Sequence, residues 1–164
     1  MQKINNILLV VLITAVNLVT NEALAESRIS VIRIGARYIT SIDGVSQGRQ
    51  RAPFGSGGGC SLQTNVNSPW PPGTYLKAIR SFELPLGARK LIVQVAIDND
   101  VQVLVNGQDI SGGLVTHEGC PNRFDFSFKE PDSILLEGTN MLEVRARDRG
   151  GETYLDTRVR VTIP

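Results

Sequence analysis

The sequence contains few of the side chains from which catalytic and metal centres are most often built. It has one histidine, His117, and two cysteines, Cys60 and Cys120, among 164 residues. Three good zinc ligands are hard to assemble from this set. No serine is marked out beside His117 for nucleophilic catalysis, and the Gly55–Gly59 run lacks the Gly-Lys-Ser/Thr ending of a phosphate loop. We therefore expect a protein that is not an enzyme and has no resident cofactor.

A large excess of either charge is also missing. The chain has 17 Lys and Arg residues against 16 Asp and Glu residues, which gives a formal net charge of +1. Proteins that bind nucleic acids usually carry a strongly basic face. A nucleic-acid partner is therefore not expected, whereas a glycan or a protein is.

Membrane-spanning segments are not expected beyond the first 25 residues. There, Lys3 supplies a positive charge, Ile7–Ile13 begins an apolar run, and Ala23-Leu24-Ala25 has the small-x-small pattern of a cleavage site. An uncleaved anchor is the alternative, but Asn17 interrupts a run that is short for a span of roughly 20 residues. We predict a signal peptide over 1–25 and export of 26–164 to the periplasm or the cell exterior, with no membrane insertion after cleavage.

Both cysteines lie in the part that is predicted to be exported. Two cysteines in an oxidising compartment usually pair, and no Cys-x-x-Cys redox motif is present. We predict a Cys60–Cys120 disulfide, worth about 4 kcal/mol by the chain-entropy estimate. Two separate buried thiols are the alternative.

Residues 26–73 and 74–164 differ in composition. The first part opens with one plausible strand, Ile29–Ile39, and then becomes rich in Gly, Ser, Asn and Pro, which hold little regular structure. We expect a long loop laid over the core and pinned by Cys60, with a flexible linker as the alternative.

The second part alternates apolar and polar residues with a period of two, which is typical of strands with one buried face. Turn signals such as Asp98-Asn99-Asp100, Asn106-Gly107 and Gly150-Gly151 separate the runs. The residues expected to face inward are Leu91, Val93, Val95, Ile97, Val101, Val103, Val105, Phe124, Phe126, Phe128, Leu142, Val144, Ala146, Leu155, Thr157, Val159, Val161 and Ile163. The pattern predicts an all-β, antiparallel sandwich in one domain over 26–164, with the core strands in 74–164.

The connection at Gly150-Gly151 leaves two arrangements open. In a two-residue hairpin, Arg145 faces Asp156 and Glu143 faces Arg158, so that opposite charges pair. If the chain crosses to the opposite sheet, as in jelly rolls, the charges lie on two separate outer faces.

Several segments resemble one known family. They are Phe82-Glu83-Leu84-Pro85, the run from Ala96 through Asp98-Asn99 to Asn106-Gly107, Phe124-Asp125-Phe126, and the run from Leu136 through Gly138-Thr139-Asn140 to Val144. They resemble the galactose-binding-domain-like jelly rolls, which include sugar-binding-type modules appended to many glycoside hydrolases. The resemblance covers roughly Trp70 to Ile163 and implies a jelly-roll sandwich with a carbohydrate ligand. Because the sequence ends at Pro164, no attached catalytic domain is expected.

The alternating direction of the strands sorts the loops into two ends. We expect 70–73, Asp98-Asn99-Asp100 and 129–140 at one end, and the 108–123 loop with Gly150-Gly151 at the other. At the first end, Trp70 and Tyr75 are candidates to stack on the apolar face of a sugar, with Asn99 and Asp100 as polar contacts. Packing of the aromatic rings over the end of the sandwich is the alternative.

The charged residues suggest two further sites. Asp98 and Asp100 approach Glu130 or Asp132 in this arrangement, and clustered carboxylates suit calcium, although no EF-hand pattern is present. Arg145, Arg147, Arg158 and Arg160 form a basic stripe for an anionic glycan or an acidic protein if their strands are neighbours. Ordinary solvated charges are the alternative in both cases.

The sequence as a whole predicts an exported, non-catalytic binding module with carbohydrate as the leading ligand class. A protein-interaction or structural subunit of an envelope or extracellular assembly is the alternative, since the fold suits it equally well.

Overall fold

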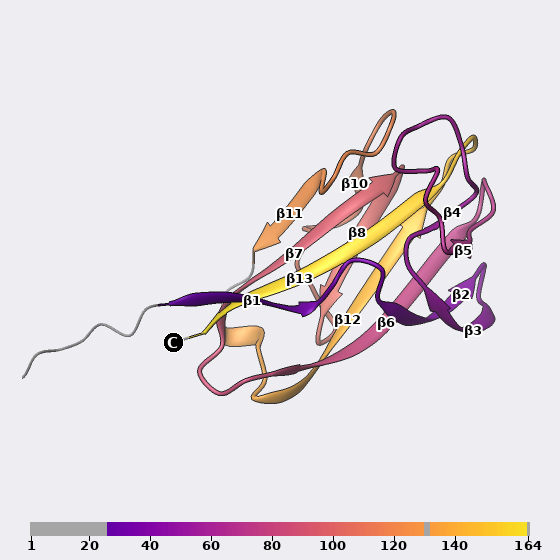
Figure 1. Cartoon of the computed structure of the whole chain (residues 1–164). Helices are drawn as coiled ribbons and strands as arrows, with labels where there is room; N and C mark the ends of the chain where they lie inside the picture. Colours follow the sequence, from indigo (N-terminus) through magenta and orange to yellow (C-terminus); the bar gives the residue numbers. More distant parts are fainter. Residues whose placement is uncertain (1–25, 130–131, 164) are drawn as a thin grey trace, which may run out of the picture.

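The computed structural model describes residues 26–129 and 132–163 (Figure 1). The predicted signal peptide and Glu130 lie outside these ranges. The elements within them are β1 (Ser27–Ile32), β2 (Arg37–Ile42), β3 (Val45–Arg51), β4 (Phe54–Gly55), β5 (Ser68–Pro69), β6 (Tyr75–Leu84), β7 (Arg89–Asp98), β8 (Asp100–Val105), β9 (Gln108–Asp109), β10 (Val115–Thr116), β11 (Phe126–Lys129), the 3₁₀ helix η1 (Asp132–Ile134), β12 (Gly138–Arg147) and β13 (Tyr154–Ile163). No helix in the described ranges is long and apolar enough to cross a membrane.

Two sheets stack to form a sandwich. Sheet A has the order β11-β7-β13-β4-β5, with β1 also paired to β13, and sheet B has the order β10-β8-β12-β6-β2-β3, with β9 also paired to β8. The strand pairs are antiparallel except β4–β5. In Figure 1, β1, β7 and β13 of sheet A lie in front of β8 and β12 of sheet B. The predicted all-β sandwich is confirmed.

The core consists largely of the side chains that the alternation assigns to the inner faces. The β-branched and aliphatic residues at these positions suit a pleated, half-buried surface, and each fully buried side chain contributes about 1.5–3 kcal/mol. The inner residues of β7 and β8 are 0% exposed: Leu91, Val93, Val95, Ile97, Val101, Val103 and Val105. Those of β12 and β13 are equally well buried: Leu142, Val144, Ala146, Leu155, Thr157, Val159 and Val161. These predictions are confirmed.

The phenylalanine run departs from the prediction. Phe126 and Phe128 pack, partly buried, against the core. Phe124 has a φ of +65°, so the alternation is broken before β11 begins at Phe126. Its ring lies beneath Arg158, with the guanidinium carbon 4.2 Å from the ring centroid, on the outer side of sheet A. The assignment of Phe124 to the core is therefore wrong.

Residues 26–73 contain more strands than the sequence indicated. The single strand expected over 29–39 is two strands, β1 in sheet A and β2 in sheet B, with a turn at Gly35 (φ +69°) between them. β2 continues through an Asp43-Gly44 turn into β3, and both turn residues have the positive φ that such hairpins require. β3 was missed because it is an edge strand with almost every side chain exposed, so it shows no apolar alternation.

The chain crosses between the sheets at Gly150-Gly151. β12 belongs to sheet B and β13 to sheet A, so Arg145 lies opposite Lys77 and Gln102 while Asp156 lies opposite Ala96. The hairpin that pairs Arg145 with Asp156 is therefore wrong, and the crossing alternative is right. The link from β7 to β8 at Asp98-Asn99 is a second crossing.

One end of the sandwich gathers most of the long loops. The strand register places Tyr75, Asp100 and Arg147 side by side at this end. The predicted Cys60–Cys120 disulfide is confirmed and joins two of the loops here, with its Cα atoms 5.5 Å apart.

The sorting of loops into two ends was only partly correct. Gly150-Gly151 lies at the same end as 98–100 and 70–73, whereas 132–140 lies at the opposite end, where Gly138 pairs with Leu84. The cause is β10, a two-residue strand at the edge of sheet B that carries the 108–123 segment back along the sandwich. A strand this short shows no alternation in the sequence. The reversal of chain direction between β8 and β10 was therefore not predicted.

Candidate functional site

Trp70 cannot stack on a ligand, because it is 0% exposed. Its backbone N–H donates to the Gly55 carbonyl (2.9 Å), and its carbonyl accepts from the Thr153 hydroxyl. The indole packs within the hydrophobic core. The stacking hypothesis for Trp70 is therefore wrong, and the packing alternative is right.

Tyr75 is exposed, but its ring is partly occupied. It is 55% exposed on the outer face of sheet B, and the guanidinium carbon of Arg147 lies 5.4 Å from its ring centroid. A small hollow of about 280 Å³ lies beside it. Tyr75 is accessible to a ligand, at a place separate from the site described below.

Asn99 and Asp100 tie the loops of the crowded end together. The Asn99 side-chain oxygen accepts from the Arg149 N–H (3.0 Å), and the Asn99 carbonyl accepts from the His117 N–H (2.9 Å). Asp100 is 3% exposed, and its carboxylate lies 3.2 Å from Arg149 Nε. Asn99 is thus hydrogen-bonded within the fold, and Asp100 is buried beside Arg149 rather than presented to a ligand.

The predicted calcium ligands that the structure describes, Asp98, Asp100 and Asp132, do not come together. Asp132 accepts from the Lys90 N–H (2.7 Å) at the start of β7, whereas Asp98 stands at the other end of that strand and accepts from Gln63 Nε2 (3.0 Å). Within 26–129 and 132–163, no group of three or more His, Cys, Asp or Glu side chains is placed to hold a metal ion. Burial, followed by the charge of Asp148, raises the pKa of Asp98.

The β2–β3 hairpin contains a Gly-x-Ser-x-Gly sequence, Gly44 to Gly48, the spacing found at the nucleophile of some hydrolases. A nucleophile in such a motif sits at a strand-to-helix turn. Ser46 instead lies on β3, and its hydroxyl oxygen accepts from the Gly48 N–H (3.3 Å). His117 follows β10, at the opposite edge of sheet B, and lies 3.3 Å from Asp125. The two residues are not brought together.

The basic stripe predicted from four arginines does not form. Arg145 and Arg147 lie on β12 in sheet B, while Arg158 and Arg160 lie on β13 in sheet A. The two pairs therefore face away from each other on opposite sides of the sandwich.

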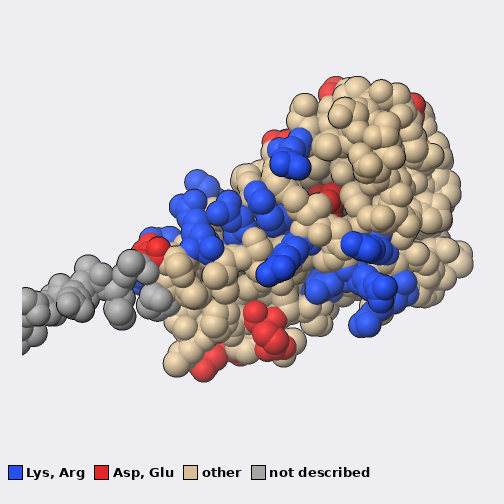
Figure 2. All heavy atoms as spheres, viewed as in Figure 1, with Lys and Arg blue, Asp and Glu red and all other residues tan. Residues whose placement is uncertain are grey.

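A different basic surface forms on the outer face of sheet A. Figure 2 shows lysine and arginine side chains in a band that crosses this face and continues over the region of β2 and β3, with most of the acidic side chains outside it. Arg158 and Arg160 contribute to it together with Arg123, since Arg160 and Arg123 both act on the charge of Arg158. No ion pair in the described part of the chain includes any of these three side chains.

A groove of about 550 Å³ is cut into this face. It lies between the turn before β2, the loop that the disulfide pins, the segment before β11 and the start of β13. The residues that matter most for its chemistry are Arg51, Asn65, Arg123, Phe124, Tyr154 and Asp156. Ile34, Leu62 and Val66 add apolar surface.

Asp156 is the most unusual of these residues. It is 4% exposed, and burial raises the pKa of its carboxyl to about 6. Its Oδ1 accepts from the N–H groups of Gly35 (3.3 Å) and Thr157 (2.8 Å), and among the described residues its Oδ2 has no hydrogen-bond donor. The groove therefore contains a nearly buried carboxylate with one free acceptor oxygen.

The neighbouring polar groups complement this carboxylate. Burial, followed by the charge of Asp156, raises the pKa of Tyr154 to about 12, so its phenol stays neutral at physiological pH. Arg158 is held over Phe124 and donates to Gln94 Oε1 (2.7 and 3.0 Å). Burial, followed by the charge of Arg160, lowers the pKa of Arg158. The groove can thus both donate and accept hydrogen bonds beside a partly apolar wall.

Sequence reasoning missed this groove for a definite reason. It placed Asp156 on an outer face exposed to solvent, but the turn at Gly35 and the 62–67 loop cover that part of sheet A. The feature of the sequence that could have indicated the groove is the Gly/Pro-rich loop, which was expected to lie over the core and to be held there by Cys60. The alternation of β13 could not show which outward residue the loop would cover.

Among known proteins, no family model matches the chain, and no curated protein matches its sequence. Solved structures do resemble it. A β-D-glucuronidase of Dictyoglomus thermophilum matches 87% of this chain and 29% of its own, with a TM-score of 0.55 and 11% identity. The match with a β-glucuronidase of an uncultured Clostridium species covers 93% of this chain and 31% of that protein, with a TM-score of 0.54 and 12% identity. The match with the Bifidobacterium dentium β-glucuronidase solved with coumarin-3-O-glucuronide covers 76% of this chain and 21% of that protein. Its TM-score is 0.50 and the identity is 20%.

The chain spans less than a third of the length of each of these three structures. At such low identity the likeness shows a shared fold, a β-sandwich that forms one portion of larger glycoside hydrolases.

Proposed function

We propose that this chain is an exported, non-catalytic domain that binds carbohydrate in the groove over sheet A. The observation that carries the proposal is Asp156, a nearly buried carboxylate with a free oxygen in a surface groove. Keeping a carboxylate ionised in such a place costs stability at neutral pH, and groups of this kind concentrate at functional sites.

The chemistry of the groove suits a sugar. Sugar hydroxyls both donate and accept hydrogen bonds. Asp156 accepts, Arg123 and Arg51 donate, and the Asn65 amide does both. The apolar edge formed by Phe124 and its neighbours is available to the C–H face of a sugar ring, in line with the mixed lining of ligand sites.

A binding role is favoured over hydrolysis by the number of carboxylates. Glycoside hydrolysis commonly uses a pair of Asp or Glu residues on either side of the scissile bond. Among the described residues that line the groove, Asp156 is the single carboxylate. The resemblance of the sequence to galactose-binding-domain-like jelly rolls supports the same role, and the shared fold with portions of glycosidases is compatible with it.

Export is part of the proposal. The disulfide suits an oxidising compartment, and the pattern over 1–25 is that of a signal peptide.

Glycan-array binding followed by titration calorimetry tests the proposal, with and without calcium. We expect Asp156→Asn to weaken binding at least tenfold, because the amide keeps an acceptor for the Gly35 N–H but replaces the free acceptor oxygen with a donor. Asn65→Ala should give a smaller loss. Arg145→Ala on sheet B is the matched control and should change nothing. If no glycan binds, or if Asp156→Asn binds as the wild type does, the groove is not the site.

A protein-interaction role is the second candidate, and one observation favours it. β3 is an edge strand of sheet B, and Val45 and Ile39 nearby are 65% and 53% exposed. Such an edge can accept a strand from a partner. Co-purification of a partner that persists in Asp156→Asn and is lost when proline replaces Gln47 on β3 supports this candidate.

A further inference from the structure

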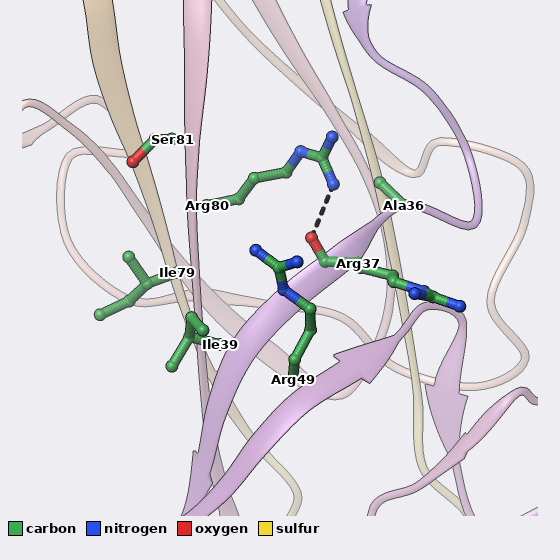
Figure 3. A pocket seen from close by; sticks show the side chains of 7 residues that line it. All are labelled: Ala36, Arg37, Ile39, Arg49, Ile79, Arg80 and Ser81. Carbon is green, nitrogen blue, oxygen red and sulfur yellow. Dashed lines mark hydrogen bonds between the residues drawn. The ribbon is translucent and has the colours of Figure 1, made fainter.

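A second hollow, of about 580 Å³, lies where β2, β3 and β6 meet, and Figure 3 shows the side chains around it. Arg49 of β3 and Arg80 of β6 stand at its sides, with Ile39 and Ile79 beside them. We call it the arginine pocket. It has no role in the groove described above and contains none of its lining residues.

Arg80 occupies an unexpected position for a charged residue. It belongs to the alternating set of β6 that faces inward, whose other members are buried and apolar: Leu76, Ala78, Phe82 and Leu84. Its Nη1 donates to the Arg37 carbonyl (2.6 Å). Its Nε is buried and has no hydrogen-bond partner among the described residues. A buried donor that stays unpaired is unfavourable, so Arg80 has unused capacity to bind an acceptor.

Arg49 brings a second positive charge to the same hollow. It lies opposite Ile39 in the β2–β3 register, and its guanidinium reaches toward that of Arg80 (Figure 3). The Arg37 guanidinium points away from them. No ion pair within the described residues includes Arg49 or Arg80. Two neighbouring guanidinium groups without a carboxylate repel each other, and a bound anion relieves that repulsion.

The surroundings indicate what carries the anion. Ile39 is 53% exposed and lies opposite Ile79, so an apolar surface adjoins the two charges. An oxyanion on a ring with an apolar C–H face fits this combination better than a free inorganic ion, because a free ion gains nothing from the isoleucines.

The arginine pocket is also close to the groove. Gly35 lines the groove and Ala36, the next residue, lines the pocket. Arg51 of the groove is the register partner of Arg37 of the pocket rim. A chain of linked sugar rings can therefore lie across both.

We propose that Arg49 and Arg80 bind the carboxylate or sulfate group of an acidic polysaccharide whose neighbouring sugars occupy the groove. The inference rests on the proposed function and names its ligand class. Guanidinium groups hold such oxyanions with paired, charge-assisted hydrogen bonds, which salt weakens when the site is exposed.

Titration calorimetry at 50 and 300 mM NaCl tests the inference with three probes of equal length: an oligosaccharide of uronic acids, its carboxyl-reduced neutral counterpart, and a sulfated oligosaccharide. We expect an acidic probe to bind at least tenfold more tightly than the neutral one, with most of that advantage lost at the higher salt concentration. Which acidic probe binds more tightly identifies the oxyanion.

The variants locate the effect. Arg49→Gln and Arg80→Gln should each remove the preference for the acidic probe and leave neutral binding unchanged. Arg37→Gln is the matched control, because its guanidinium points away from the pocket, and it should keep the preference. Arg49 is on an exposed edge strand, so Arg49→Gln stays informative even if the half-buried Arg80 cannot be replaced without unfolding.

Several results overturn the inference. Equal affinity for acidic and neutral probes does so, as does an acidic preference that survives Arg49→Gln. Equally tight binding of a single-stranded oligonucleotide or of polyglutamate also overturns it, because the site then selects charge and not sugar. If the neutral probe binds through Asp156 while the acidic preference is absent, this inference fails and the proposed function stands. If Asp156→Asn changes the binding of none of the probes, the proposed function fails, whatever the result for the arginine pocket.

Discussion

The arginines on the outer face of β12 and those on the outer face of sheet A differ in whether their charges have partners. On β12 of sheet B, Arg145 pairs with Glu143 (2.6 Å) and the Arg147 guanidinium lies over the Tyr75 ring, so the arginines of this strand are engaged by their neighbours. On sheet A, Arg123, Arg158 and Arg160 have no ion-pair partner among the described residues, and Asp156 is covered by loops. The fold does not require this second arrangement, since the outer face of β12 in sheet B forms without one. Unpaired charge is thus the better guide to function on this protein, and three predictions test the contrast.

The largest effect is expected from the disulfide, which fastens the loops that wall the groove. Replacing both Cys60 and Cys120 with serine should lower the free energy of unfolding by about 4 kcal/mol, since the disulfide closes a long loop. Urea unfolding measures this loss. Glycan binding in the groove should weaken in the variant that remains folded, because the 62–67 loop and Arg123 are no longer held together.

The matched observation is on sheet B. The proximity of Arg147 to Tyr75, followed through tyrosine fluorescence in the folded variant, should stay as in the wild type. Unchanged glycan affinity in the double-serine variant contradicts the view that the pinned loops shape the groove.

The next largest effect concerns Asp156. Its pKa in the folded protein is raised to about 6, above the usual value near 3.8, so folding favours its protonated form. This contribution is fully present below pH 4 and is lost as pH rises through 6. Asp156→Asn should therefore stabilise the protein at pH 8, by at most about 3 kcal/mol, and much less at pH 4.

Unfolding free energies at the two pH values measure the effect. Arg123, Tyr38 and Tyr154 lie around this carboxyl and are present in both proteins, so the difference between wild type and variant isolates Asp156. Glu143→Gln on sheet B is the control and should show no such pH-dependent gain. An equal effect of Asp156→Asn at pH 4 and pH 8 contradicts the assignment of the raised pKa.

The smallest effect compares single charges on the two faces. Glu143→Gln removes the partner of Arg145 and should destabilise the protein by about 0.5 kcal/mol. Arg160→Gln removes a charge that faces other arginines and should stabilise it by a similar, small amount. Thermal unfolding in low and high salt checks both, and high salt should abolish both shifts. Destabilisation by Arg160→Gln shows instead that its charge is compensated.

Local pattern was sufficient for much of the fold. The alternation predicted the inner residues of β7, β8, β12 and β13, because each of those strands has a covered face that must be apolar. Asn106-Gly107 was expected to form a turn, and both residues have the positive φ of a two-residue hairpin. Short or edge strands such as β3 and β10 were not predictable, because they bury too few side chains to show an alternation of apolar and polar residues.

The candidate site was predicted less well than the fold. Trp70 was chosen as a ligand contact because it is a lone aromatic residue in a loop, yet a large apolar ring is equally suited to fill the core. Asn99 and Asp100 were chosen as polar rim residues, but at the crossing between sheets Asn99 bonds to neighbouring loops and Asp100 is buried beside Arg149. Tyr75 alone of the four retains an exposed side chain, 55% accessible.

The sequence by itself determined that this protein is a two-layer β structure closed by a disulfide, because side-chain alternation and paired cysteines act through local geometry and simple chain statistics. The tertiary structure alone decided that the chain crosses from sheet B to sheet A at Gly150-Gly151, that a loop covers Asp156, and that Arg49 and Arg80 line the same hollow. Those outcomes depend on which distant segments pack together, and the periodicity of a single strand carries no record of its neighbours across the sandwich.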